Sequence, residues 1–148
     1  HYGLIPNDGL SRKTVFNNLI LVGDSAGQAN PLVLEGIRYA IKFGRVAGKV
    51  AADAIENGKT DESSLYPYEE NWRKAIESKI NSAGKVQDRW IGLSDKEWDR
   101  ELDIISELKT EEFLDFIKAE FGLSNMLKLA VSHPKLAVRQ LFNLVRGR

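Results

Sequence analysis

The sequence has 148 residues, of which 43% are hydrophobic, a composition typical of a globular domain with an apolar core. Its 21 basic and 21 acidic residues cancel, which argues against a dedicated nucleic-acid binder. There is no cysteine, and two histidines cannot form a cluster, so disulfides, thiolate catalysis and zinc–thiolate sites are excluded within these residues and no metal site is predicted.

The chain begins with His1 rather than Met, and no basic leader with an apolar run follows it. We therefore interpret it as a fragment or processed product that carries no secretory signal. No apolar stretch approaches the roughly 18 residues that a spanning helix needs. Since the lack of cysteine is compatible with a reducing compartment, we expect a cytoplasmic protein.

The first half of the chain predicts one strand followed by a long helix. Residues 1–18 are polar and rich in turn signals, and they are expected to be connecting backbone. The aliphatic run 19–22 lies between Asn18 and Gly23, a pattern typical of a strand covered on both faces. After Pro31 the spacing changes to three and four, and Asn57-Gly58 supplies a helix stop. The stripe expected to be buried is Ile37, Ala40, Ile41, Gly44, Gly48, Ala51, Ala52 and Ile55.

The second half predicts further helices separated by polar connectors. The connector 59–64 precedes a helix with Pro67 in its first turn, Ser94-Asp95-Lys96-Glu97 is a capping box, and Thr110 is suited to cap the next helix. The inward-facing residues are expected to be Leu65, Tyr68, Trp72, Ile76 and Ile80, then Trp98, Leu102 and Ile105, then Phe113, Leu114, Ile117 and Phe121, and in a final helix Val138, Leu141, Phe142 and Val145.

One strand with about six helical pieces is an unusual ratio, because a buried strand needs neighbouring strands. The predicted fold class is therefore mostly α, with a remnant of an α/β domain whose other strands lie in a missing amino-terminal portion. The three tryptophans, Trp72, Trp90 and Trp98, are interpreted as packing residues. His133 before Pro134 is interpreted as a helix-start residue.

The segment from Gly23 to Ile37 is the candidate binding site. Asp24 at the end of a strand is suited to accept hydrogen bonds from sugar-like hydroxyls. The helix start near Gly36 and Ile37 offers unpaired amides that favour negative charge on a ligand. Asn30-Pro31 shapes the loop between them. Spacing alone is more typical of a generic strand, turn and helix that bind nothing.

The residues themselves add a resemblance. Residues 21–27, Asn30-Pro31, Gly36-Ile37 and Ala40 closely resemble the second flavin-binding motif of the geranylgeranyl reductase family, within the aromatic-hydroxylase-like flavoproteins. Residues 2–6 resemble the loop that precedes this motif in the family, and residues 65–73 resemble the helix that follows. The resemblance covers roughly the first half of the chain.

This resemblance implies an FAD-dependent oxidoreductase that reduces double bonds of a prenyl lipid, with residues 1–58 as the carboxy-terminal part of a Rossmann-like FAD-binding domain and 59–148 as a helical region. It implies cofactor contacts from Gly23, Asp24, Asn30, Pro31, Gly36 and Ile37. Asp24 would contact the ribityl chain, Pro31 would lie beside the isoalloxazine, and the amides of Gly36 and Ile37 would face its pyrimidine edge. The expected partners are FAD, an isoprenoid or other apolar substrate, and the missing amino-terminal part.

Several readings stay open. Many relatives place two or three glycines before the helix, whereas residues 32–35 here precede a single Gly36. Glu35 is interpreted either as a proton donor or polar wall beside the flavin, or as a partner of the helix dipole, so no catalytic residue is assigned. The alternatives for function are a flavin hydroxylase or carotenoid cyclase of the same group, and a non-catalytic helical interaction or membrane-surface module.

The helical tail is electrically divided. Residues 94–121 carry ten acidic and four basic side chains, whereas residues 122–148 carry five basic and no acidic ones. The basic amphipathic end is suited either to peripheral contact with an anionic membrane or to covering other parts of the protein.

Overall fold

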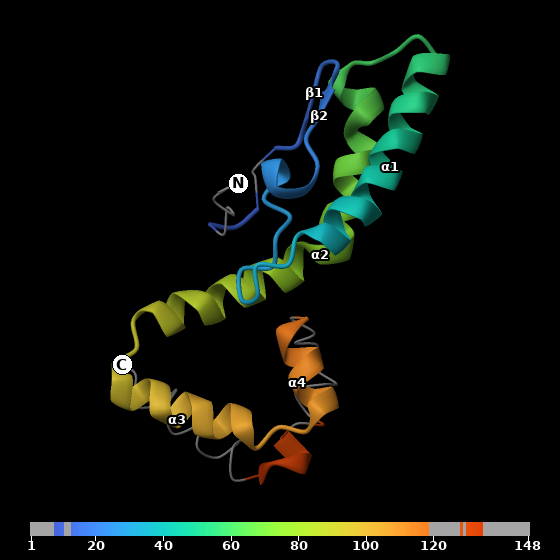
Figure 1. The fold of residues 1–148 in the computed structure, drawn as a ribbon. Coiled ribbons are helices and arrows are strands. Elements are labelled where there is room, and N and C mark those ends of the chain that lie inside the picture. Colours follow the sequence, from blue (N-terminus) through green and yellow to red (C-terminus); the bar gives the residue numbers. More distant parts are fainter. Residues whose placement is uncertain (1–7, 11–12, 119–127, 129, 135–148) are drawn as a thin grey trace. The chain divides into compact units, whose positions relative to one another are not determined.

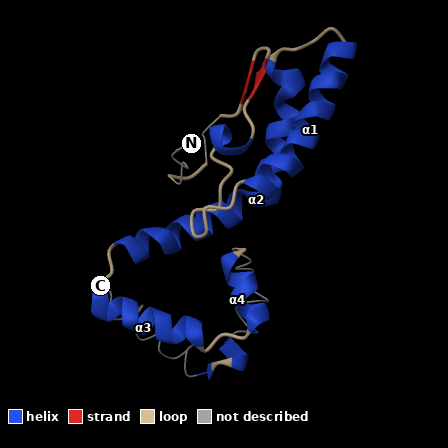
Figure 2. Cartoon of the chain, viewed as in Figure 1, coloured by secondary structure: helices blue, strands red, loops and turns tan. Residues whose placement is uncertain are grey.

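The structure is a computed structural model that describes residues 8–10, 13–118, 128 and 130–134. In this part of the chain the elements are β1 (Val15–Phe16), β2 (Leu19–Ile20), the 3-10 turn η1 (Gly23–Ala26), α1 (Ile37–Glu56), α2 (Glu62–Ile91), α3 (Asp95–Ser106) and α4 (Thr110–Ile117). The fold is mostly helical, and its strands form one short hairpin (Figures 1 and 2). The chain divides into two compact units, residues 1–89 and 90–148.

The strands form a tight antiparallel hairpin. Val15 pairs with Ile20 and Phe16 with Leu19, and Asn18 adopts a φ of 62° in the two-residue turn, a conformation that asparagine tolerates. The prediction of a strand from Leu19 to Val22 buried on both faces is wrong, because the strand ends at Ile20 and Leu19 is 48% exposed. The turn reverses the chain, so the segment expected to be connecting backbone supplies the partner strand.

Helix α1 has the predicted extent, but a different face of it is buried. It begins at Ile37 and ends at Glu56, and Gly58 follows with a φ of 63°. The buried residues are Tyr39, Phe43, Ala47 and Ala54. The predicted stripe is wrong in this respect, since Ile37, Ile41 and Ile55 are 79%, 57% and 68% exposed. The larger side chains at 39 and 43 lie on the neighbouring face, and that face packs against α2 and β1.

Helix α2 begins earlier than its pattern predicts. Asp61 accepts hydrogen bonds from the Ser64 backbone N–H at 3.2 Å and from the Ser64 hydroxyl at 3.0 Å, and this cap starts the helix at Glu62. Pro67 therefore lies inside the helix and not in its first turn. The predicted inward-facing residues are confirmed as buried: Leu65, Tyr68, Trp72, Ile76 and Ile80.

The core of residues 1–89 lies between α1, α2 and the hairpin. In Figure 1, α1 runs beside the first turns of α2, and their buried aromatic and aliphatic side chains form one cluster with Val15. Trp72 is fully buried in it, which confirms its interpretation as a packing residue. The compact unit that contains α1 and α2 extends to residue 89. The boundary expected after residue 58 concerns which residues bind the cofactor, and it stays a prediction.

A buried carboxylate ties the hairpin to α2. Glu69 accepts hydrogen bonds from the Thr14 backbone N–H at 2.7 Å and from the Thr14 hydroxyl at 2.9 Å, and it pairs with Arg73 at 2.9 Å. The indole N–H of Trp72 donates to the same Thr14 hydroxyl at 2.9 Å. Burial raises the pKa of Glu69, but the hydrogen bonds from Thr14 and Arg73 outweigh burial and lower it overall.

In residues 90–118 the predicted capping box is confirmed: the Glu97 carboxylate accepts the Ser94 backbone N–H at 2.9 Å. Lys109, and not Thr110, is the residue that precedes the first turn of α4. Trp90 contacts Trp98 and Phe116, with ring centroids 5.2 and 5.8 Å apart.

The inward-facing positions predicted for these two helices are partly wrong. Leu102, Phe113 and Leu114 are exposed, because Trp90 contacts only the sides of α3 and α4 that carry Trp98 and Phe116. Phe121, the final helix and most of the basic tail lie outside the described residues. Among the described helices, none is both long enough and apolar enough to span a bilayer.

Candidate functional site

The turn after β2 packs directly on the start of α1. Gly23 has a φ of 67°, in the left-handed region that favours glycine, and a Cβ added to it would lie 3.1 Å from the Cβ of Ala40. Backbone hydrogen bonds from Gly27 to Asp24 and from Gln28 to Gly23, both 3.0 Å, close the turn. Ala40 therefore lies in close contact with this turn.

Asp24 lies beside the amino-terminus of α1. Its side chain is exposed, and a Cβ added to Gly36 would lie 2.5 Å from its Oδ1 atom. No hydrogen bond to this carboxylate is found among the described residues. Gly36 precedes the first turn of α1 without a side-chain cap, and that turn contains no acidic residue. A solvent-accessible acceptor and the donor end of a helix thus lie next to each other.

Asn30 and Pro31 are buried within the loop that joins the turn to α1. The Asn30 backbone N–H donates to the Glu35 carbonyl at 2.9 Å, and the Asn30 Oδ1 atom accepts the Leu32 N–H at 2.9 Å. The Gln87 side chain of α2 donates to the Pro31 carbonyl at 3.2 Å. These two residues shape the loop from inside, and a contact of Pro31 with a flavin stays a prediction.

Glu35 forms a two-point ion pair with Arg38. The guanidinium Nε and Nη2 atoms lie 2.6 and 2.9 Å from the two carboxylate oxygens, and the guanidinium stacks over Tyr39 at 4.8 Å. The Glu35 carboxylate therefore has a cationic side-chain partner in the first turn of α1, and its role beside a flavin or at the helix dipole stays a prediction.

A ring of buried hydrogen bonds holds the turn from the side of α2. The Gly23 N–H donates to Gln28 Oε1 at 2.9 Å, Gln28 Nε2 donates to the Tyr68 hydroxyl at 3.1 Å, and that hydroxyl donates to the Leu21 carbonyl at 2.8 Å. Burial raises the pKa of Tyr68, so its hydroxyl stays a donor at neutral pH. The helical pattern predicts Tyr68 only as an inward-facing residue, and no pattern in the sequence signals Gln28.

Of the predicted site residues, the structure therefore brings Gly23, Asp24, Gly36 and Ile37 together at the start of α1. The Ile37 side chain is 79% exposed, so only its backbone belongs to the helix start. Asn30 and Pro31 contribute by fixing the loop.

Comparison with known proteins identifies relatives, although no family model matches the chain. It is 40% identical over 97 residues to digeranylgeranylglycerophospholipid reductase 2 of Methanothermobacter thermautotrophicus, covering 66% of this chain and 25% of that protein. It is 35% identical over 127 residues to digeranylgeranylglycerophospholipid reductase 1 of Methanococcoides burtonii, covering 84% of this chain and 31% of that protein.

A solved structure of similar fold has a related name. The crystal structure of a geranylgeranyl bacteriochlorophyll reductase-like protein from Thermoplasma acidophilum superposes with a TM-score of 0.69 at 26% identity, covering 95% of this chain and 33% of that one. The chain thus spans about a quarter to a third of the length of the relatives it matches. By sequence and by fold, the chain belongs to the geranylgeranyl reductase family.

Proposed function

We propose that this chain is part of an FAD-dependent oxidoreductase that reduces double bonds of a geranylgeranyl-type prenyl lipid, and that it supplies the ribityl and isoalloxazine side of the flavin site. The names of the relatives support the reductase activity and the lipid substrate. The observation that carries the cofactor assignment is the exposed Asp24 carboxylate beside Gly36 at the start of α1.

The residues present fit one side of a flavin. A ribityl chain offers hydroxyl donors, and Asp24 offers an accessible acceptor at the end of a turn that α2 holds in place. The flavin pyrimidine ring carries carbonyl acceptors and takes negative charge when reduced, and the uncapped start of α1 offers amide donors with a partial positive charge. Gly36 permits this arrangement, since a larger residue there would meet the Asp24 carboxylate.

When bound in its reduced form, FAD would supply a hydride to one carbon of an isolated double bond, and a proton added to the other carbon would complete the reduction. The residues of this chain would bind and orient it: Asp24 by accepting a ribityl hydroxyl, and the start of α1 by stabilising charge on the pyrimidine edge. Residues for the adenosine diphosphate part would come from another part of a longer polypeptide, so that residues 1–58 complete a Rossmann-like domain. Peripheral membrane contact through the basic tail is part of the same proposal.

The test uses the complete protein and measures FAD affinity by flavin fluorescence. Asp24→Ala removes a hydrogen bond to a charged acceptor worth about 1.5–3 kcal/mol, so the dissociation constant should rise about 10- to 150-fold. Asp53→Ala is the matched control, because Asp53 is an exposed carboxylate near the opposite end of α1. Equal affinities for the two variants would show that Asp24 does not hold the flavin.

Two further results bear on the whole proposal. A complete protein that shows no bound-flavin absorption after reconstitution with FAD would exclude the flavoenzyme assignment. A prenyl-lipid substrate should be reduced without stoichiometric oxygen uptake, because hydride transfer to carbon needs no oxygen. Oxygen consumption coupled to substrate would instead indicate a hydroxylase.

A further inference from the structure

The outer face of α1 is apolar and largely exposed. We define it by Ile37, Ile41, Gly44, Gly48 and Ile55, which follow one another at helical spacing. The three isoleucines are 79%, 57% and 68% exposed, and nothing from the described part of the chain outside the helix backbone lies within 4 Å of a Cβ added to Gly44 or Gly48. Single exposed apolar residues are common on protein surfaces, whereas a continuous row of them marks a contact surface.

The sequence of α1 is that of a helix covered on two sides. Successive residues turn by about 100°, so the buried face at Tyr39 and Phe43 and the outer face at Ile37 and Ile41 together take more than half of the circumference. The charged side chains Arg38, Lys42, Arg45 and Lys49 fill the remaining sector. A helix packed against the protein on one side needs an apolar stripe of only about 100°.

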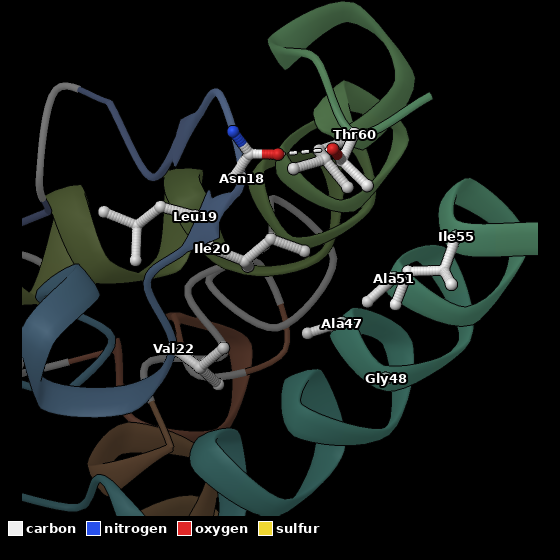
Figure 3. A pocket seen from close by; sticks show the side chains of 10 residues that line it. Asn18, Leu19, Ile20, Val22, Ala47, Gly48, Ala51, Ile55 and Thr60 are labelled. Carbon is white, nitrogen blue, oxygen red and sulfur yellow. Dashed lines mark hydrogen bonds between the residues drawn. The ribbon is translucent and has the colours of Figure 1, made fainter. Parts of the chain in front are cut away.

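A groove continues the outer face toward the hairpin. Figure 3 shows Leu19, Ile20 and Val22 on one side of it and Gly48, Ala51 and Ile55 of α1 on the other. Its volume is about 350 Å³, and the hydrogen-bonded pair Asn18 and Thr60 lies at its edge. The exposed Leu19 of β2 belongs to this groove, so the exposed parts of the strand and of the helix form one surface.

The composition of this surface favours a packed protein element over a membrane. Helices that lie on lipid present bulky Trp, Phe and Leu side chains. The outer face instead has glycines at 44 and 48 between aliphatic ends, and small residues allow a neighbouring backbone to approach closely. A concave, small-residue surface fits an inserted segment of protein.

The relatives indicate where that segment comes from. Up to 95% of this chain aligns with proteins of which it makes up only a quarter to a third. We infer that the outer face of α1 and the adjoining groove are the packing surface for the remainder of the same polypeptide. This inference rests on the proposal that the chain is part of a longer protein, and not on the identity of the cofactor.

The first experiment measures maleimide labelling of the complete protein. Ile41→Cys introduces a thiol on the outer face, and Lys49→Cys introduces one on the charged face of the same helix; the chain itself contributes no other cysteine. We expect Ile41→Cys to react at least about tenfold more slowly than Lys49→Cys, because labelling would require local opening. Equal rates would overturn the inference. Protection that disappears on dilution to monomer would assign the surface to a second copy, and protection that requires added anionic vesicles would assign it to lipid; either would also overturn it.

The second experiment does not depend on a new cysteine. Gly48→Ala and Gly84→Ala both add a methyl group inside a helix where nothing described lies within 4 Å. Helix propensity alone would raise the Tm of both variants. If another segment packs on the outer face, Gly48→Ala should lower the Tm of the complete protein while Gly84→Ala raises it. An equal rise for both variants would show that nothing packs closely at Gly48.

Discussion

Tyr68→Phe tests whether α2 holds the candidate cofactor turn in place. The substitution removes one hydroxyl and keeps the ring, so the core loses no volume. It leaves the Leu21 carbonyl and the Gln28 Nε2 group without their 2.8 and 3.1 Å partner. Each fully buried unsatisfied group costs about 1–3 kcal/mol, and the hydrogen bond to the Leu21 carbonyl is only partly buried, so we expect local opening of residues 21–28 to become about 2–4 kcal/mol easier.

Hydrogen–deuterium exchange of the complete protein measures this opening directly. A change of about 2–4 kcal/mol corresponds to exchange about 30- to 1000-fold faster in peptides that cover the turn. The Gly23 amide is the most informative group, since it donates to Gln28 within the same ring. Tyr66→Phe is the matched control, because Tyr66 lies on the same helix and is 50% exposed. Unchanged exchange of the turn in Tyr68→Phe would refute the role assigned to this ring.

Two further predictions concern neighbouring residues. Gly36→Ala should displace the Asp24 carboxylate, 2.5 Å from the added Cβ, and so weaken FAD binding with little change in Tm, whereas Gly84→Ala in α2, outside the outer face of α1, should leave FAD affinity unchanged. Glu69→Gln should make the fall of Tm between pH 7 and pH 3 less steep than in the unmodified protein. Because folding lowers the pKa of Glu69 below its ordinary value of 4.5, its stabilisation is complete above that pH and is lost as the pH falls through the folded pKa. Thermal melts from pH 7 to pH 3 measure this dependence. If Tm falls as steeply in Glu69→Gln as in the exposed control Glu70→Gln, the prediction is contradicted.

Local signals were sufficient to predict where the helices lie. The stop at Asn57-Gly58 and the capping box at Ser94 correspond to helix ends in the structure, because both act within a few residues. The buried face of α1 could not be predicted in the same way. Periodicity identifies apolar positions, and α1 has two adjacent apolar faces. Which one meets α2 depends on the large side chains Tyr39 and Phe43, which pack with residues such as Trp72 further along the chain.

In the candidate site too, the local features were predictable and the contacts between distant residues were not. Gly23, Asp24 and Gly36 all belong to the turn and loop that lead into α1. A strand-to-helix connection of this length therefore predicts that they lie close together at the start of α1. The support of the turn was not predictable, because Tyr68 lies 40 residues from Gln28 and neither residue type signals the pairing. The hairpin was missed for a related reason: its two-residue strands are too short to show alternation.

The candidate cofactor turn and the outer face of α1 adjoin each other at the start of α1. Ile37 begins the outer face, and it directly follows Gly36, beside which the Asp24 carboxylate lies. On the side of α2 the turn is satisfied by buried hydrogen bonds, whereas Asp24 and the isoleucines of α1 remain exposed. A segment that covers the outer face would therefore end next to Asp24. Packing of the remaining polypeptide on α1 and completion of the flavin site would then be the same event, and a substitution at Ile41 that loosens this packing should also weaken FAD binding, although Ile41 itself need not touch the cofactor.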